Sequence, residues 1–129
     1  MNRCVTLAAA LSASITLSLP AAAQLQRHFP ATALRGELRV VQPPEVQLNG
    51  KPARLAPGVR IRGQNNLLVM SGALVEREVA VHYTLDPYGL VKDVWLLTEA
   101  ELDKRPWPTT LEDAKAWRFD PVGQTWSRP

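Results

Sequence analysis

The chain has 129 residues, with 15 lysines and arginines against 12 aspartates and glutamates. A chain of this length builds one small hydrophobic core, which excludes a multidomain architecture. Its net charge of +3 is ordinary for a soluble protein and does not by itself require a polyanionic partner. The single cysteine excludes a disulfide framework within the chain.

The N-terminal residues have the pattern of a secretory signal peptide. Arg3 gives a positive start, residues 5–19 are apolar or small, and small residues close the segment at Ala23. Serines and a threonine interrupt the apolar run, which is too weak for a membrane span of about 20 apolar residues. We therefore expect residues 1–23 to be removed, leaving a periplasmic or secreted protein without a transmembrane segment. Cys4 leaves with them, so the mature chain has no disulfide, cysteine nucleophile or cysteine-bound metal.

Positive charge gathers in the first half of the expected mature chain. Residues 24–64 hold seven cations against two acids, whereas residues 65–129 hold seven cations against ten acids. Such asymmetry points either to a polar recognition surface or to attraction between the two halves.

Residues 24–33 form an extended segment that leads into the first predicted strand. In residues 34–41 apolar and charged residues alternate, which is the period of a half-buried strand, and Pro43-Pro44 ends it. Residues 46–48 and 53–55 flank Asn49-Gly50, whose positive φ angles suit a tight hairpin turn.

The next residues are expected to form another turn and an apolar strand. Pro57-Gly58 marks the turn, after which residues 59–62 resume the alternation. Residues 67–70 are apolar on both faces, so we expect them to form a central or covered strand.

Two longer strands are predicted in the second half. Residues 74–85 place Val79, Val81 and Tyr83 on one face. Asp86-Pro-Tyr-Gly89 has the proline and glycine placement of a β-turn. It leads into residues 90–97, which are again apolar on both faces.

Helix signals appear only towards the C-terminus. Thr98 with Glu101 matches a capping box and opens a short helix that Pro106 ends, while Thr110 resembles a second cap. The predicted fold of residues 34–129 is therefore a single, mainly β domain. It is a small antiparallel β-barrel or strongly curved sheet of about six or seven strands, with one or two short C-terminal helices and a Trp/Pro-rich tail from Arg105.

Enzymatic motifs are absent from the sequence. It has no phosphate-binding glycine loop, nucleophile elbow or dinucleotide fingerprint, and His28 and His82 lack metal-ligand spacing. A lone strand histidine such as His82 is expected to be half-exposed. Glu76 and Glu78 share a strand face and could act as an acid and base or bind calcium, but a solvated face is the simpler interpretation. We nominate no catalytic, cofactor-binding or metal-binding residue, and expect no cofactor.

Two sets of residues remain as binding candidates. Outward arginines of the predicted strands could bind phosphate or carboxylate groups. Alternatively, they could merely decorate an exposed face and oppose the acids of the second half across strands. Tryptophans of the tail could contact a ligand or partner, or they could pin the tail across the sheet. The first set is Arg35, Arg39, Arg54, Arg60 and Arg62, and the second is Trp107, Trp117 and Trp126.

Several short runs resemble a family of short, uncharacterised exported proteins of Gram-negative bacteria. The resemblance covers about residues 29–101 and implies export and a single β domain, with no functional residues to transfer. The runs are Phe29-Pro-Ala-Thr-Ala-Leu-Arg-Gly36, Pro43-Pro-Glu-Val46, Leu48-Asn-Gly50, Arg54-Leu-Ala-Pro-Gly58, Ile61-Arg-Gly63, Asn66-Leu-Leu-Val-Met-Ser-Gly-Ala-Leu74 and Val94-Trp-Leu-Leu-Thr98.

The function expected from these features is that of an exported, non-enzymatic β domain that interacts with another component of the cell envelope. Its partner would be an envelope protein or an anionic envelope polymer. A nucleic-acid-binding small barrel is an alternative that the basic strands fit, although a signal peptide argues against it. A small exported enzyme without a recognisable motif is the other alternative.

Overall fold

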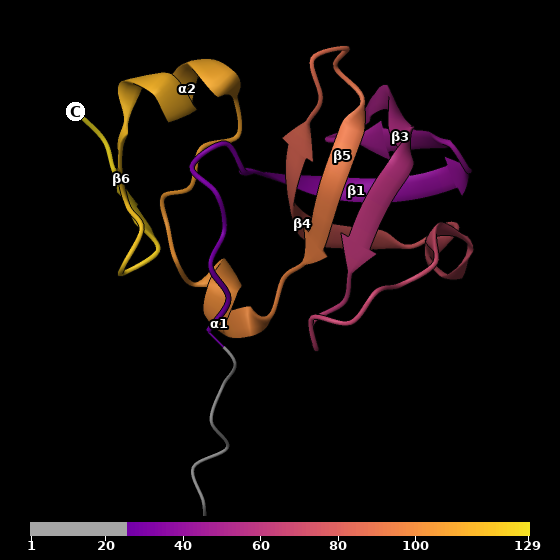
Figure 1. Cartoon of the computed structure of the whole chain (residues 1–129), viewed down its shortest axis with the longest axis horizontal. Coiled ribbons are helices and arrows are strands. Elements are labelled where there is room, and N and C mark those ends of the chain that lie inside the picture. Colours follow the sequence, from indigo (N-terminus) through magenta and orange to yellow (C-terminus); the bar gives the residue numbers. More distant parts are fainter. Residues whose placement is uncertain (1–25) are drawn as a thin grey trace, which may run out of the picture.

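The structure is a computed structural model that describes residues 26–129 (Figure 1). The predicted signal peptide and its cleavage point lie outside the described residues. No helix within residues 26–129 is long and apolar enough to cross a membrane. The described part is mainly β, as the sequence predicts, with a larger sheet, a small hairpin and two short α-helices.

Five strands pair into a closed ring in the order β1-β2-β3-β5-β4, with β4 paired back to β1. They are β1 (Leu34–Gln42), β2 (Glu45–Leu48), β3 (Lys51–Arg62), β4 (Glu78–Leu85) and β5 (Val91–Leu96). The contact between β3 and β5 is parallel and the other pairs are antiparallel. The predicted antiparallel arrangement therefore holds for the pairs of the ring other than β3–β5, where the connection through β4 returns β5 alongside β3 in the same direction.

The hairpin between β2 and β3 follows the prediction. Asn49 and Gly50 have φ angles of 54° and 78°, the left-handed conformation that this two-residue turn requires. The Asn49 side chain also accepts a hydrogen bond from the backbone N–H of Glu37 on β1, at 2.9 Å. The turn is thereby tied to the neighbouring strand as well as to its own hairpin.

The turn predicted at Pro57-Gly58 is wrong. Strand β3 runs through both residues from Lys51 to Arg62, and its pairing with β5 shifts register between Leu55 and Arg60. A register shift accommodates a proline that has no N–H to donate, so the chain bends within the strand instead of reversing.

The covered strand predicted at residues 67–70 is also wrong. This segment is a loop in which Leu67 and Met70 are 65% and 81% exposed, and its strand-like pairing is a single bridge from Leu68 to Arg62. A short 3-10 helix, η1 (Ser71–Leu74), follows and buries Leu74 in the ring. Strand β4 begins only at Glu78, because the chain first crosses from the end of β3 to β1, where Val75 forms an isolated bridge with Val40.

Both predicted helix caps are present. Thr98 and Glu101 form a full capping box at the start of α1 (Glu99–Leu102), and the Thr110 side chain accepts a hydrogen bond from the N–H of Asp113 in α2 (Leu111–Ala116). After α2 the chain forms a hairpin of β6 (Arg118–Asp120) and β7 (Thr125–Ser127), two strands that are not among those predicted from the sequence.

The buried apolar residues form two clusters. One fills the ring and includes Leu38, Val81 and Val94. The other contains Phe29, Leu97, Trp107 and Trp126 and lies between the sheet and the C-terminal segments. Figure 1 shows the N-terminal segment passing between the sheet and the β6–β7 hairpin, so chain from both ends of the described part meets here.

Candidate functional site

The N-terminal segment, residues 26–33, is anchored by a buried ion pair. Arg27 donates to both carboxylate oxygens of Glu101 on α1, with an Nε–Oε2 distance of 2.9 Å. Its terminal nitrogens also donate to the backbone carbonyls of Gly63 at 2.8 Å and Leu96 at 2.6 Å. One side chain thus joins the N-terminal segment to α1 and to the ends of β3 and β5.

The Glu101 carboxylate is held in its charged form by these contacts. Burial would raise the pKa of Glu101, but hydrogen bonds from Arg27 and from the backbone N–H of Thr98 outweigh it, and the pKa lies below its ordinary value. The capping box locates Glu101 in the sequence, whereas nothing local indicates that its partner is Arg27.

His82 on β4 is wholly buried, so the prediction of a half-exposed histidine is wrong. The C-terminal segments cover the sheet face on which its ring lies. The ring stacks on Trp107 with centroids 4.1 Å apart, and the Phe29 ring meets it edge-on at 4.5 Å. Neither ring nitrogen has a hydrogen-bond partner in the described part of the chain.

The imidazole of His82 stays neutral over the ordinary pH range. Burial lowers its pKa to about 2, and the nearby charges of Arg35 and Arg27 act in the same direction. A contact with the Leu34 backbone opposes them with the smallest effect, but it does not have the geometry of a hydrogen bond. A histidine with so low a pKa is a poor general base at neutral pH. It still offers one N–H donor and one nitrogen acceptor.

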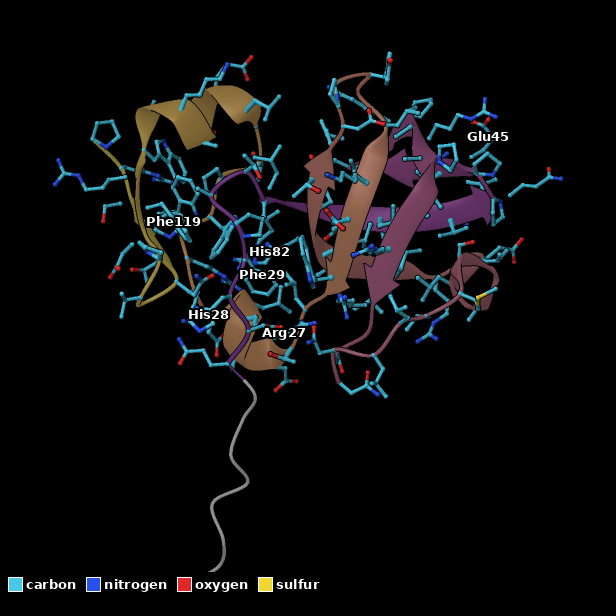
Figure 2. All side chains as sticks on the ribbon, viewed as in Figure 1. Arg27, His28, Phe29, Glu45, His82 and Phe119 are labelled. Carbon is cyan, nitrogen blue, oxygen red and sulfur yellow. The ribbon has the colours of Figure 1, made fainter. Side chains whose placement is uncertain are left out.

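A cavity of about 490 Å³ lies against this histidine, and we call it the histidine cavity. Figure 2 shows Arg27, Phe29 and His82 gathered between the sheet and the C-terminal segments. Aromatic rings form one part of the wall, and amide and charged groups form the rest. The lining residues are Gln26, Arg27, Phe29, Gln64, His82, Thr98, Glu99, Ala100, Glu101, Lys104, Trp107 and Gln124.

Arg35 lies on the other side of Trp107 and is only partly exposed. Its guanidinium sits over the Trp107 ring, 5.4 Å from the centroid, and donates to the carbonyls of Glu101 at 2.7 Å and Lys104 at 2.9 Å. Its Nε is buried and has no partner among residues 26–129. Burial, and then repulsion from Arg105, lower the pKa of Arg35 to about 10.

An open hollow of about 500 Å³ extends outward from Arg35. Three arginines line it, and none of the described residues that line it is acidic. We call it the arginine hollow, and its lining is Arg35, Arg105, Pro106, Trp107 and Arg128. Trp107 lines both cavities, so this one ring lies between the histidine cavity, which holds charges of both signs, and the arginine hollow, whose charged lining is cationic.

The other arginines predicted as a binding surface do not line this hollow. Arg54 forms an exposed ion pair with Glu45 at 3.5 Å, and Arg62 donates to the Asn66 carbonyl at 3.2 Å. Figure 2 places Glu45 at the far end of the sheet from His82.

Arg39 and Arg60 are exposed on separate strands of the ring. Arg39 on β1 is the register partner of Glu78, and Arg60 on β3 is that of Asp93. These register positions fit the alternative in which the arginines oppose acids of the second half, and Arg35 is the predicted arginine that reaches the arginine hollow.

The tryptophans of the tail are mostly buried. Trp107 and Trp126 are 5% exposed, and the Trp107 Nε1–H donates to the Ala33 carbonyl at 2.9 Å. Trp117 is half-buried, with Arg128 over its ring at 5.1 Å. These positions fit the alternative in which the tail is pinned across the sheet, although Trp107 also lines both cavities.

The pair predicted from Glu76 and Glu78 on one strand face is wrong, because Glu76 precedes β4 and has a φ of 63°. Glu37 and Glu78, on β1 and β4, face solvent, and a side-chain hydrogen bond to Glu78 raises the pKa of Glu37. Among residues 26–129, no group of three or more histidine, cysteine, aspartate or glutamate side chains is placed to hold a metal ion.

The comparisons with known proteins add no relative. No protein family, no curated protein and no solved structure matches the chain. The arginine hollow and the histidine cavity are therefore interpreted from their own chemistry.

Proposed function

We propose that this is an exported, non-enzymatic binding domain that recognises an anionic group on another component of the cell envelope through the arginine hollow. The observation that carries the proposal is the convergence of three arginines, Arg35, Arg105 and Arg128, on one open surface without an acid among its described lining. The signal-peptide pattern of residues 1–23 supports the exported setting.

The chemistry of the hollow favours an anion. Guanidinium groups bind carboxylate and phosphate oxygens through paired, charge-assisted hydrogen bonds. Arg35 has an Nε–H with no partner in the described residues, and its charge is destabilised by its own burial and by Arg105. An anion in the hollow would offset the repulsion between the arginines, and its oxygens could accept bonds from the free N–H groups of Arg105 and Arg128.

The nucleic-acid alternative finds less support. Five-stranded Greek-key folds that bind oligonucleotides use the face of strands 2 and 3, and single-stranded nucleic acid stacks its bases on exposed aromatic rings. The exposed residues of β2 and β3 include Lys51, Arg54 and Arg60, but neither strand contains an aromatic residue. Arg54 is moreover paired with Glu45.

Heparin, a soluble anionic polymer, provides a direct test. Binding would be measured by calorimetry at two salt concentrations, for the wild type and for two double variants with the same change in charge. Arg105→Glu with Arg128→Glu alters the hollow, and Arg54→Glu with Arg60→Glu alters the β3 strand. Arg35 is left in place because it also supports the chain after α1.

We expect wild-type binding to weaken as salt is raised, because exposed charges are screened. The hollow variant should lose about tenfold or more in affinity, whereas the β3 variant should stay within about threefold of the wild type. Equal losses in both variants would mean that only net charge matters, and the proposal would be wrong. Absence of binding to heparin and to phosphate-bearing lipopolysaccharide would also overturn it.

A further inference from the structure

We infer that the histidine cavity is a second binding site, for a small uncharged ligand that carries an aromatic ring and one hydroxyl or amide group. This inference does not depend on the anion-binding function, because the two cavities have different linings and share Trp107 alone. It follows from the size, the charge balance and the unpaired polar atoms of the cavity.

The size and surface of the cavity suit a small organic molecule. Its volume of about 490 Å³ lies within the range of about 300–1,000 Å³ that ligand pockets occupy. Phe29, His82 and Trp107 present aromatic surface against which a ring can pack. Gln64 and Thr98 add polar groups at the wall, which can orient a ligand.

The charges of the cavity are already balanced. All three guanidinium nitrogens of Arg27 donate hydrogen bonds, and its charge is paired with Glu101. The Lys104 ammonium donates to the carbonyl of Gly123 at 2.8 Å, and Glu99 is exposed. A charged ligand would lose hydration beside the His82 and Trp107 rings, where the buried Arg27–Glu101 pair is already complete, so the site favours an uncharged one.

His82 supplies the specific recognition. A buried polar group without a hydrogen bond is costly, and both of its ring nitrogens lack partners in the described residues. A neutral imidazole needs one donor and one acceptor, which a hydroxyl or a primary amide can both provide. His82 itself lines the cavity, so a ligand bound there lies against the ring whose nitrogens lack partners.

Benzamide is a suitable probe, because it combines one ring with an uncharged donor and acceptor. We would titrate it into the protein and follow the imidazole resonances of both described histidines by NMR. The expected affinity is in about the millimolar range for so small a molecule. The signals of His82 should move, while those of the exposed His28 should not.

Related probes separate the contributions of charge and hydrogen bonding. Benzoate and benzylammonium, which carry a charge on the same ring, should bind at least about tenfold more weakly than benzamide. His82→Phe keeps an aromatic ring against Trp107 but removes both nitrogens. It should weaken benzamide by about fivefold or more and leave the affinity for toluene unchanged.

The inference would be wrong if benzamide left the His82 signals in place, or if benzoate bound as tightly as benzamide. It would also be wrong if a folded His82→Phe protein bound benzamide as well as the wild type does. If that variant does not fold, the order of affinities among the probes for the wild type still tests the inference. The Arg105→Glu, Arg128→Glu protein should retain benzamide binding while losing heparin, which distinguishes failure of one site from failure of the other.

Discussion

The rings of His82 and Trp107 are stacked, with centroids 4.1 Å apart and planes inclined by 27°. His82 belongs to a strand of the ring, whereas Trp107 lies in the chain between the two short helices. The stack therefore joins the sheet to the C-terminal segments, and its Trp107 ring lines both the histidine cavity and the arginine hollow.

Removing Arg27 should destabilise the protein strongly. Arg27→Met leaves the Glu101 carboxylate partly buried without its partner, and we expect a loss of about 3–5 kcal/mol in the free energy of unfolding. Urea unfolding measures the loss. Arg54→Met breaks the ion pair with Glu45, whose side chains are both 59% exposed, and should cost less than about 1 kcal/mol. Similar losses in Arg27→Met and Arg54→Met would contradict the conclusion that the Arg27–Glu101 pair is buried and anchors the N-terminal segment.

Stability should fall as the pH drops below about 6.5. In the folded protein the pKa of His82 is lowered to about 2, whereas in the unfolded chain the ring takes up a proton near pH 6.5. Between these two pKa values the unfolded state binds more protons than the folded state. Each unit of acidification there lowers the free energy of unfolding by up to about 1.4 kcal/mol. The lowered pKa of Glu101 adds a loss at more acidic pH, as its carboxylate is protonated.

His82→Phe isolates the histidine contribution to this pH dependence. Urea unfolding between pH 8 and pH 5 should show a shallower decline for this variant than for the wild type. The same substitution at the exposed His28 should reproduce the wild-type slope. If His82→Phe declined as steeply as the wild type, His82 would not be held neutral in the folded protein.

Trp107 should be a structural residue as well as a cavity wall. Trp107→Ala removes the stack on His82, the cation contact with Arg35 and the hydrogen bond to Ala33. We expect a loss of about 3–5 kcal/mol, seen as a lower thermal midpoint. Tyr88→Ala, at a ring that is 90% exposed, should change stability by no more than about 0.5 kcal/mol. A mild effect at Trp107 would mean that the C-terminal segments do not depend on it.

Two glycines test the course of β3. Gly50 has a φ of 78° with open space around it, so Gly50→Ala should cost about 1–2 kcal/mol through backbone strain alone. Gly58 also has open space but no positive φ, so Gly58→Ala should be neutral or stabilising by up to about 1 kcal/mol. Both are measured by chemical unfolding. A comparable loss of stability in Gly58→Ala would indicate that residues 57–58 form the turn predicted from the sequence.

Much of the local structure could be predicted because it depends on neighbouring residues. The Asn49-Gly50 turn needs two residues that accept positive φ, and the Thr98 cap needs a glutamate three positions on. The apolar run at residues 67–70 misled the prediction, because a covered strand and an exposed apolar loop have the same local composition. Only the path of the chain between β3 and β4 distinguishes them.

The candidate sites could be predicted less well. Arg35 and Trp107 were identified, but Arg105 and Arg128 join them through the fold alone. Arg27 and Glu101 are 74 residues apart, and although the capping box locates Glu101, no local pattern distinguishes Arg27 from an exposed charge. Likewise, His82 has the alternation of a half-exposed strand residue until the C-terminal segments cover it. Periodicity and turn chemistry act over a few residues and determine the elements, whereas burial and charge pairing depend on which elements meet, and so arise only in the folded chain.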